Sequence, residues 1–95
     1  MNFEAIHEAY AYDLLLWHNY AYRIECFPEL TDSEFDELEA WSVSRWPWLA
    51  IVGSDNADDY PLYIQLKRRP MEWQRAERDA RLRDIRIDWE LDNLD

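Results

Sequence analysis

The sequence predicts an α+β fold, mostly helical, in a single small domain spanning residues 1–95. We expect an antiparallel helical hairpin in residues 1–47, a short β-hairpin in residues 48–66 and a long C-terminal helix in residues 70–94. Three observations lead to this prediction. Apolar residues recur at helical spacing near both ends of the chain, a capped helix start follows the first proline, and two apolar runs flank a polar loop.

The first helix is expected to run from Phe3 to about Glu25. Its apolar residues recur every three or four positions, as on one face of a helix. These residues are Phe3, Ile6, Tyr10, Leu14, Trp17, Ala21 and Ile24. Pro28 ends the helix, because the residue before a proline avoids the helical conformation.

The second helix begins with two local motifs. Thr31 and Glu34 form a capping box, and Leu30 and Phe35 occupy the two positions of a hydrophobic staple. The helix is expected to stop before Pro47. Helices joined by such a short corner usually fold back on one another, so an antiparallel pair is expected.

The predicted β-hairpin consists of the apolar runs Trp48–Val52 and Tyr60–Leu66, which are rich in β-branched and aromatic residues. The sequence GSDNADD between them is typical of a turn. Pro61 would place its strand near a sheet edge. The acidic loop lacks the spacing of a calcium-binding EF-hand, so we interpret it as a solvated loop.

The C-terminal helix carries two apolar stripes. Pro70 suits its first turn. One stripe consists of Trp73, Ala76, Ala80, Ile87, Leu91 and Leu94, and the opposite stripe of Leu82, Ile85 and Trp89. The second stripe could join two copies of the chain in a homodimer. Residues 85–91 also alternate apolar and charged side chains, as a half-buried strand does. We prefer a helix because no Gly or Pro interrupts it.

The charge is concentrated in the first two thirds of the chain. Residues 1–66 contain 13 acidic and two basic residues, whereas residues 67–95 contain eight of each, and the net charge is −11. Such a surface would repel a nucleic-acid backbone, so direct nucleic-acid binding is not expected. A basic protein is the natural partner. Alternatively, the acidity serves only solubility.

The sequence favours a cytoplasmic protein, in the host cytosol if a phage encodes it. The single cysteine, Cys26, allows no internal disulfide and fits a reducing compartment. The N-terminus has no charged region before an apolar run, as a secretion signal would. No apolar run is long enough to cross a bilayer, so no membrane association is expected.

One stretch resembles a known family. Tyr20 and Tyr22 precede a proline corner, then the hexapeptide TDSEFD (residues 31–36), and then a helix that ends at the Arg45-Trp46-Pro47 triplet. This pattern resembles the small N-terminal helical domain, Ia, of bacterial NAD-dependent DNA ligases. The resemblance covers residues 14–49.

In the ligases this domain holds the nicotinamide mononucleotide half of NAD. The resemblance therefore implies a cofactor-binding site formed by Tyr22, Arg23, Asp32, Phe35 and Asp36. An aromatic face can stack on a cationic nicotinamide ring, and carboxylates can bind its charge and the ribose hydroxyls. Two residues depart from the family pattern. Arg23 replaces a histidine and could meet a phosphate, and Phe35 replaces a tyrosine and lacks its hydroxyl.

Nothing in the chain indicates an enzyme. The ligases act through a lysine in a K-x-D-G motif on a separate adenylation domain, and the only lysine here, Lys67, lies in LKRRP. His7 and His18 have no further cluster to complete a metal site. One glycine cannot supply a phosphate-binding loop. We expect neither a catalytic residue nor a metal.

Three hypotheses for the function follow. The first is a non-catalytic acidic interaction protein, such as a phage-type inhibitor of the anti-CRISPR or anti-restriction class. It would bind the basic site of a nucleic-acid-handling protein, by mimicking nucleic acid. The predicted partner-binding carboxylates are Asp32, Glu34, Asp36, Glu37, Glu39, Asp55, Asp58 and Asp59. The alternatives are an accessory module that binds nicotinamide mononucleotide or NAD, and a structural oligomerising domain.

Overall fold

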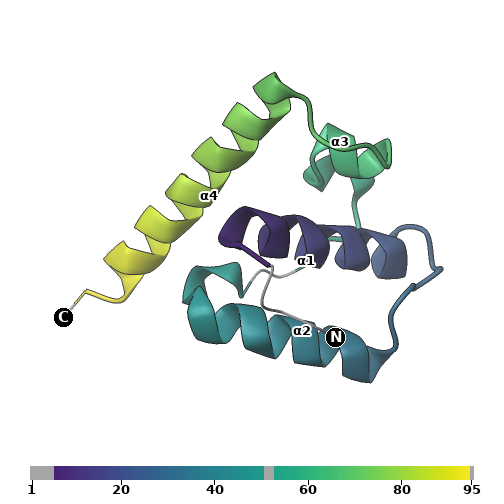
Figure 1. Ribbon diagram of the computed structural model, residues 1–95, viewed down its shortest axis with the longest axis horizontal. Helices are drawn as coiled ribbons and strands as arrows, with labels where there is room; N and C mark the ends of the chain where they lie inside the picture. The colour runs from purple at the N-terminus through teal and green to yellow at the C-terminus, as the bar shows by residue number, and fades with distance from the viewer. Residues whose placement is uncertain (1–5, 51–52, 95) are drawn as a thin grey trace.

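The computed structural model describes residues 6–50 and 53–94, and every regular element in these ranges is helical (Figure 1). In chain order the elements are α1 (Glu8–Arg23), α2 (Asp32–Arg45), the 3-10 turns η1 (Pro47–Leu49) and η2 (Ala57–Asp59), α3 (Leu62–Gln65) and α4 (Glu72–Asp92). Helix α1 is central, because α2, α3 and α4 all pack against it.

Helices α1 and α2 form the expected antiparallel pair. The His7 side chain caps α1 by accepting a hydrogen bond from the backbone N–H of Tyr10, at 3.3 Å. Residues 3–5 of the predicted helix lie outside the described residues. After α1 the chain reverses through Cys26, whose φ of 54° lies in the left-handed region. The Phe27 N–H then donates back to the Ala21 carbonyl at 3.0 Å, which fixes the corner.

The predicted start of α2 is confirmed. The Thr31 hydroxyl accepts from the Glu34 N–H, and the Glu34 carboxylate accepts from the Thr31 N–H, both at 3.1 Å. These hydrogen bonds lower the pKa of the Glu34 carboxyl, because they favour its charged form. Leu30 and Phe35 both pack against the main core. The helix ends at Arg45, before Pro47, as the sequence predicts.

The predicted β-hairpin is wrong. Within the described residues no strand forms; η1, η2 and α3 occupy this part of the chain, and residues 51–52 are not described. Pro61 precedes the first turn of α3, where its missing N–H is not needed. Tyr63 and Ile64 are buried from the single turn of α3, and Tyr60, at the end of η2, is buried beside them in the same cluster.

Helix α4 includes residues 85–91, so the helix predicted there, rather than a strand, is confirmed. The helix begins at Glu72, so Pro70 precedes it and does not lie in its first turn. Its stripes are used in the opposite way from the dimer hypothesis. Leu82 is buried in the core, Ile85 packs beside it, and the Trp89 ring lies edge-on to Trp48 with centroids 6.0 Å apart. The stripe that stays exposed includes Trp73, Ile87, Leu91 and Leu94.

Two clusters of buried side chains hold the helices together. The larger joins α1, α2, η1 and α4 through Leu15, Leu38, Leu49 and Leu82, with Ala11 and Tyr12. The smaller joins α1 to η2 and α3 through Tyr20, Tyr60, Tyr63 and Ile64. None of the helices in the described part of the chain has the length and apolar character needed to span a membrane.

Candidate functional site

The five residues that the ligase resemblance singles out lie around one pocket of about 340 Å³. We call it the corner pocket, because it lies where the chain turns from α1 into α2. Its lining residues are His18, Asn19, Tyr22, Arg23, Pro28, Glu29, Leu30, Asp32, Phe35 and Asp36. The sequence alone pointed to half of these residues, and the helical hairpin brings them together.

The last turn of α1 supplies Tyr22 and Arg23. The Tyr22 ring is 58% exposed and is therefore free to contact a ligand. The Arg23 guanidinium forms an ion pair with Asp55 at 3.2 Å. Gly53, the only glycine of the chain, lies directly against this side chain. A Cβ at Gly53 would come within 2.5 Å of Arg23 Nε and Asn19 Oδ1, so glycine permits the close approach.

The first turns of α2 supply Asp32, Phe35 and Asp36. Asp32 and Asp36 are four residues apart on the helix, so their carboxylates lie on one face and repel each other. Neither forms an ion pair with a described residue, and both are exposed. Phe35 is half-buried, with its side chain against the core. The pocket thus combines aromatic groups with unneutralised carboxylates.

His18 also lines the corner pocket, although the sequence did not single it out for a site. Burial lowers the pKa of its imidazole, and the neighbouring Glu29 opposes this effect only in part. Its Nδ1 atom is buried and has no hydrogen-bond partner. The imidazole is therefore neutral at pH 7, and it adds a polar but uncharged group to the wall.

The carboxylates predicted to bind a partner are spread over two elements. Asp32, Asp36 and Glu39 follow one side of α2, whereas Glu34 and Glu37 lie on the other side of its buried face. The remaining three lie before α3, Asp55 in a loop and Asp58 and Asp59 in η2. Asp55 pairs with Arg23, Asp59 accepts a hydrogen bond from the Ser54 hydroxyl, and Asp58 is exposed.

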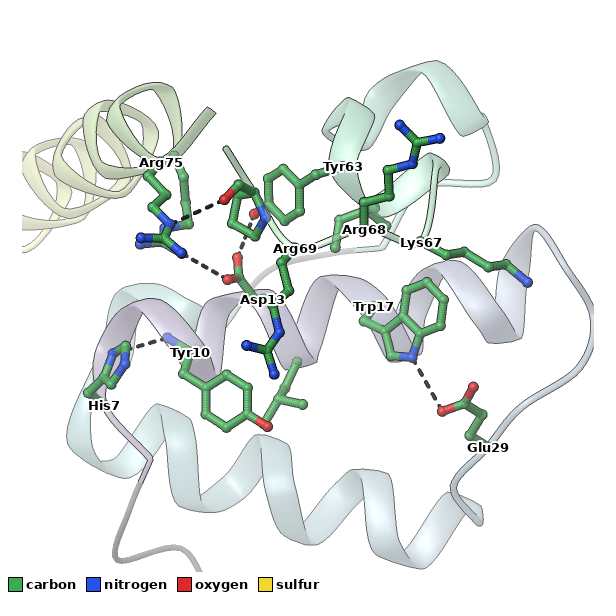
Figure 2. A pocket seen from close by; sticks show the side chains of 14 residues that line it. His7, Tyr10, Asp13, Trp17, Glu29, Tyr63, Lys67, Arg68, Arg69 and Arg75 are labelled. Carbon is green, nitrogen blue, oxygen red and sulfur yellow. Dashed lines mark hydrogen bonds and ion pairs between the residues drawn. The ribbon is translucent and has the colours of Figure 1, made fainter. Parts of the chain in front are cut away.

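A second pocket, of about 820 Å³, lies on the side of α1 that faces α3 and the start of α4 (Figure 2). We call it the basic pocket, because Lys67, Arg68, Arg69, Arg75 and Arg78 line it, together with only two acidic residues, Asp13 and Glu29. Sequence reasoning missed this site. The LKRRP run was visible, but nothing placed it against α1.

The basic side chains are not equally engaged. Arg78 donates to Asp13 at 2.9 Å, Lys67 pairs with Glu25 at 2.5 Å, and Arg75 donates only to the backbone carbonyl of Pro70. The guanidinium groups of Arg68 and Arg69 form no hydrogen bond or ion pair with any described residue. In Figure 2 the Arg69 side chain extends over α1 toward Tyr10.

Within residues 6–50 and 53–94, no group of three His, Cys, Asp or Glu side chains is arranged to hold a metal ion. In comparisons with known proteins, no family model, no curated protein and no solved structure matches this chain. The two pockets therefore have to be interpreted from their own chemistry.

Proposed function

We propose that the chain is a non-catalytic binding protein whose corner pocket holds nicotinamide mononucleotide, either free or as part of NAD. The observation that carries this proposal is the convergence of Tyr22, Arg23, Asp32, Phe35 and Asp36 on one pocket. These are the positions that match the nucleotide-holding positions of the ligase Ia domain.

The charges of the pocket suit this ligand. Glu29, Asp32 and Asp36 outnumber the single cation Arg23. A positively charged nicotinamide ring placed between Asp32 and Asp36 would relieve their mutual repulsion. The exposed ring of Tyr22 offers a face for the same cation, and Arg23 offers a guanidinium to the phosphate.

The test is titration calorimetry with nicotinamide mononucleotide and with its reduced form, which lacks the positive ring charge. The oxidised form is expected to bind and the reduced form to bind at least tenfold more weakly. The variant D36N should lose about tenfold in affinity, since it removes one charged contact. The matched control is E37Q, the corresponding carboxylate-to-amide change one residue further along, on a side chain that does not line the pocket.

Absence of binding at millimolar nicotinamide mononucleotide would refute the proposal. Equal affinity for the two forms, or equal losses in D36N and E37Q, would refute the role of the carboxylates. A gain in affinity on F35Y, which restores the hydroxyl found in the family, would add support.

A second function is favoured by a separate observation. The five carboxylates of α2 form no ion pair with a described residue, so their charge is available to a basic protein. In this proposal the chain acts as an inhibitor that covers the nucleic-acid site of its target, as expected for the phage-type class.

This function is tested with a variant that leaves the corner pocket unchanged, E37Q/E39Q. Retention of nucleic-acid-binding proteins from a bacterial lysate should decrease as salt rises, and should decrease in the variant at low salt. If retention is the same in the variant and at high salt, charge does not drive the interaction and this second proposal is wrong.

A further inference from the structure

We propose that the basic pocket is a binding site for a free nucleoside diphosphate or triphosphate. The inference goes beyond the proposed function and rests on different residues. Glu29 lines both pockets, whereas the basic side chains line this one alone.

The pocket has a positive excess in a strongly negative protein. Five basic and two acidic side chains line it, while the whole chain has a net charge of −11. Asp13 is already engaged with Arg78, and Glu29 accepts a hydrogen bond from the Trp17 indole N–H at 3.3 Å. The two acids are therefore poorly placed to neutralise Arg69 and Arg75, which have no acidic partner among the described residues.

Unpaired guanidinium groups of this kind suit phosphate. Arginine presents several N–H donors in a plane and binds phosphate oxygens in pairs. Arg69 precedes α4 in the sequence and Arg75 lies in its first turns, so both line the pocket near the N-terminal, positive end of that helix. A diphosphate has enough charge to engage both, whereas one carboxylate does not.

The pocket also has an aromatic wall that a phosphate alone would not use. Tyr10 and Trp17 from α1 and Tyr63 from α3 line it. Trp17 already has Lys67 over its ring, at 5.9 Å from the centroid, and the Tyr63 hydroxyl is bonded to Asp13. Tyr10 is 47% exposed and lines the same pocket as Arg69, so the open part of its ring can contact a nucleobase (Figure 2).

The size and the surroundings favour a small ligand over a nucleic-acid strand. A volume of about 820 Å³ lies within the range of small-molecule pockets. A strand would extend beyond the pocket along a chain whose net charge is −11, and its further phosphates would be repelled by that excess of acidic side chains. A free nucleotide ends within the basic region and avoids this repulsion.

The test is titration calorimetry of the full chain with ADP, adenosine, inorganic pyrophosphate and a short single-stranded DNA. ADP is expected to bind, and adenosine and pyrophosphate each to bind at least tenfold more weakly. The variant R69Q should weaken ADP binding about tenfold. Its matched control is R83Q, which removes one exposed arginine of α4 that does not line the pocket.

R69Q alters an exposed side chain without bonds to described residues, so folding should be retained, and R69K provides a check by restoring part of the affinity. The variant Y10L tests the aromatic wall, and it should weaken the binding of ADP but not that of pyrophosphate. Failure of millimolar ADP to bind would overturn the proposal, as would equal effects of R69Q and R83Q. Pyrophosphate binding as tightly as ADP would exclude the nucleoside, and tighter binding of the DNA would indicate a nucleic-acid site.

Discussion

Asp13 joins three helices and offers the sharpest test of how the fold is held together. The Tyr63 hydroxyl donates to one of its carboxylate oxygens at 2.5 Å, and Arg78 Nη1 donates to the other at 2.9 Å. The side chains of Arg78 and Asp13 are only 14% and 19% exposed. Burial and the bond to Asp13 raise the pKa of Tyr63, so its hydroxyl remains a donor at neutral pH.

We expect the variant D13N to lose about 2–3 kcal/mol in the free energy of unfolding. A hydrogen bond to a charged group contributes about 1.5–3 kcal/mol, and breaking a fully buried ion pair costs about 3–5 kcal/mol. The expected loss is smaller than the about 3–5 kcal/mol of a fully buried pair, because Asp13 and Arg78 keep some contact with water and an Asn at position 13 can still accept the hydrogen bond from Tyr63. For a domain of this size the loss corresponds to a decrease in Tm of roughly 8–24 °C.

Urea unfolding followed by circular dichroism at pH 7 measures this loss. The matched control is D79N, which removes the other carboxylate bonded to Arg78, at 3.3 Å, but on a side chain that is 64% exposed. Its effect should stay within about 0.5 kcal/mol. If D13N and D79N unfold at the same urea concentration, the hydrogen bonds of Asp13 to Tyr63 and Arg78 do not stabilise the fold.

Three further predictions concern stability. The variant T31A removes the cap of α2 and should cost about 1 kcal/mol in urea unfolding; an unchanged midpoint would mean that the cap is dispensable. Leu38 is fully buried, and L38A should cost about 2–5 kcal/mol, more than L62A at the half-exposed Leu62; similar losses would contradict the assigned core. Burial lowers the pKa of His18 in the folded state, so the unfolded chain takes up the proton more readily. The folded protein is therefore most stable above pH 6.5, the pKa of an unfolded histidine, and loses stability as the pH falls below it. The variant H18Q should therefore lose less stability than the parent between pH 7.5 and pH 5.5, and parallel losses would contradict this.

The features of the fold that the sequence predicted are local ones. The capping box of Thr31 and Glu34 needs only four residues, and the end of α2 before Pro47 follows from the conformation that proline imposes on its predecessor. Both depend on residues that are neighbours in the chain, so they can be recognised without knowing the tertiary structure. The corner pocket could be predicted for the same reason, because its walls are the end of α1 and the start of α2, which are close together in the sequence.

The predicted β-hairpin is wrong because it rested on the β-branched and aromatic composition of residues 48–66. The run Tyr60–Leu66 has the residues of a strand, but strand preference reflects packing surroundings more than the backbone itself. Here Tyr60 packs edge-on against Tyr20 with ring centroids 5.3 Å apart, and Tyr63 and Ile64 join the same cluster. Tyr60 reaches this cluster from the extended end of η2, and Tyr63 and Ile64 reach it from α3. The sequence could not show that α1 was their partner.

The basic pocket depends on tertiary structure in the same way. Arg69 and Arg75 are far from Tyr10 in sequence, and they meet because α4 packs across α1 through Leu82. The sequence pattern suggested a dimer contact for the stripe that contains Leu82. In the structure this stripe faces the core instead, and the other stripe is exposed. With the dimer contact assumed, the turn carrying the basic residues could not be placed against α1.

The two pockets have opposite charge and share a border at Glu29, which makes their independence a physical question. If they are separate sites, D36N weakens nicotinamide mononucleotide but not ADP, and R69Q weakens ADP but not nicotinamide mononucleotide. If a single dinucleotide spans both, each variant lowers the affinity for NAD, and NAD binds more tightly than either fragment because the second contact becomes intramolecular. An NAD affinity no greater than that of the better fragment would show that the pockets act separately.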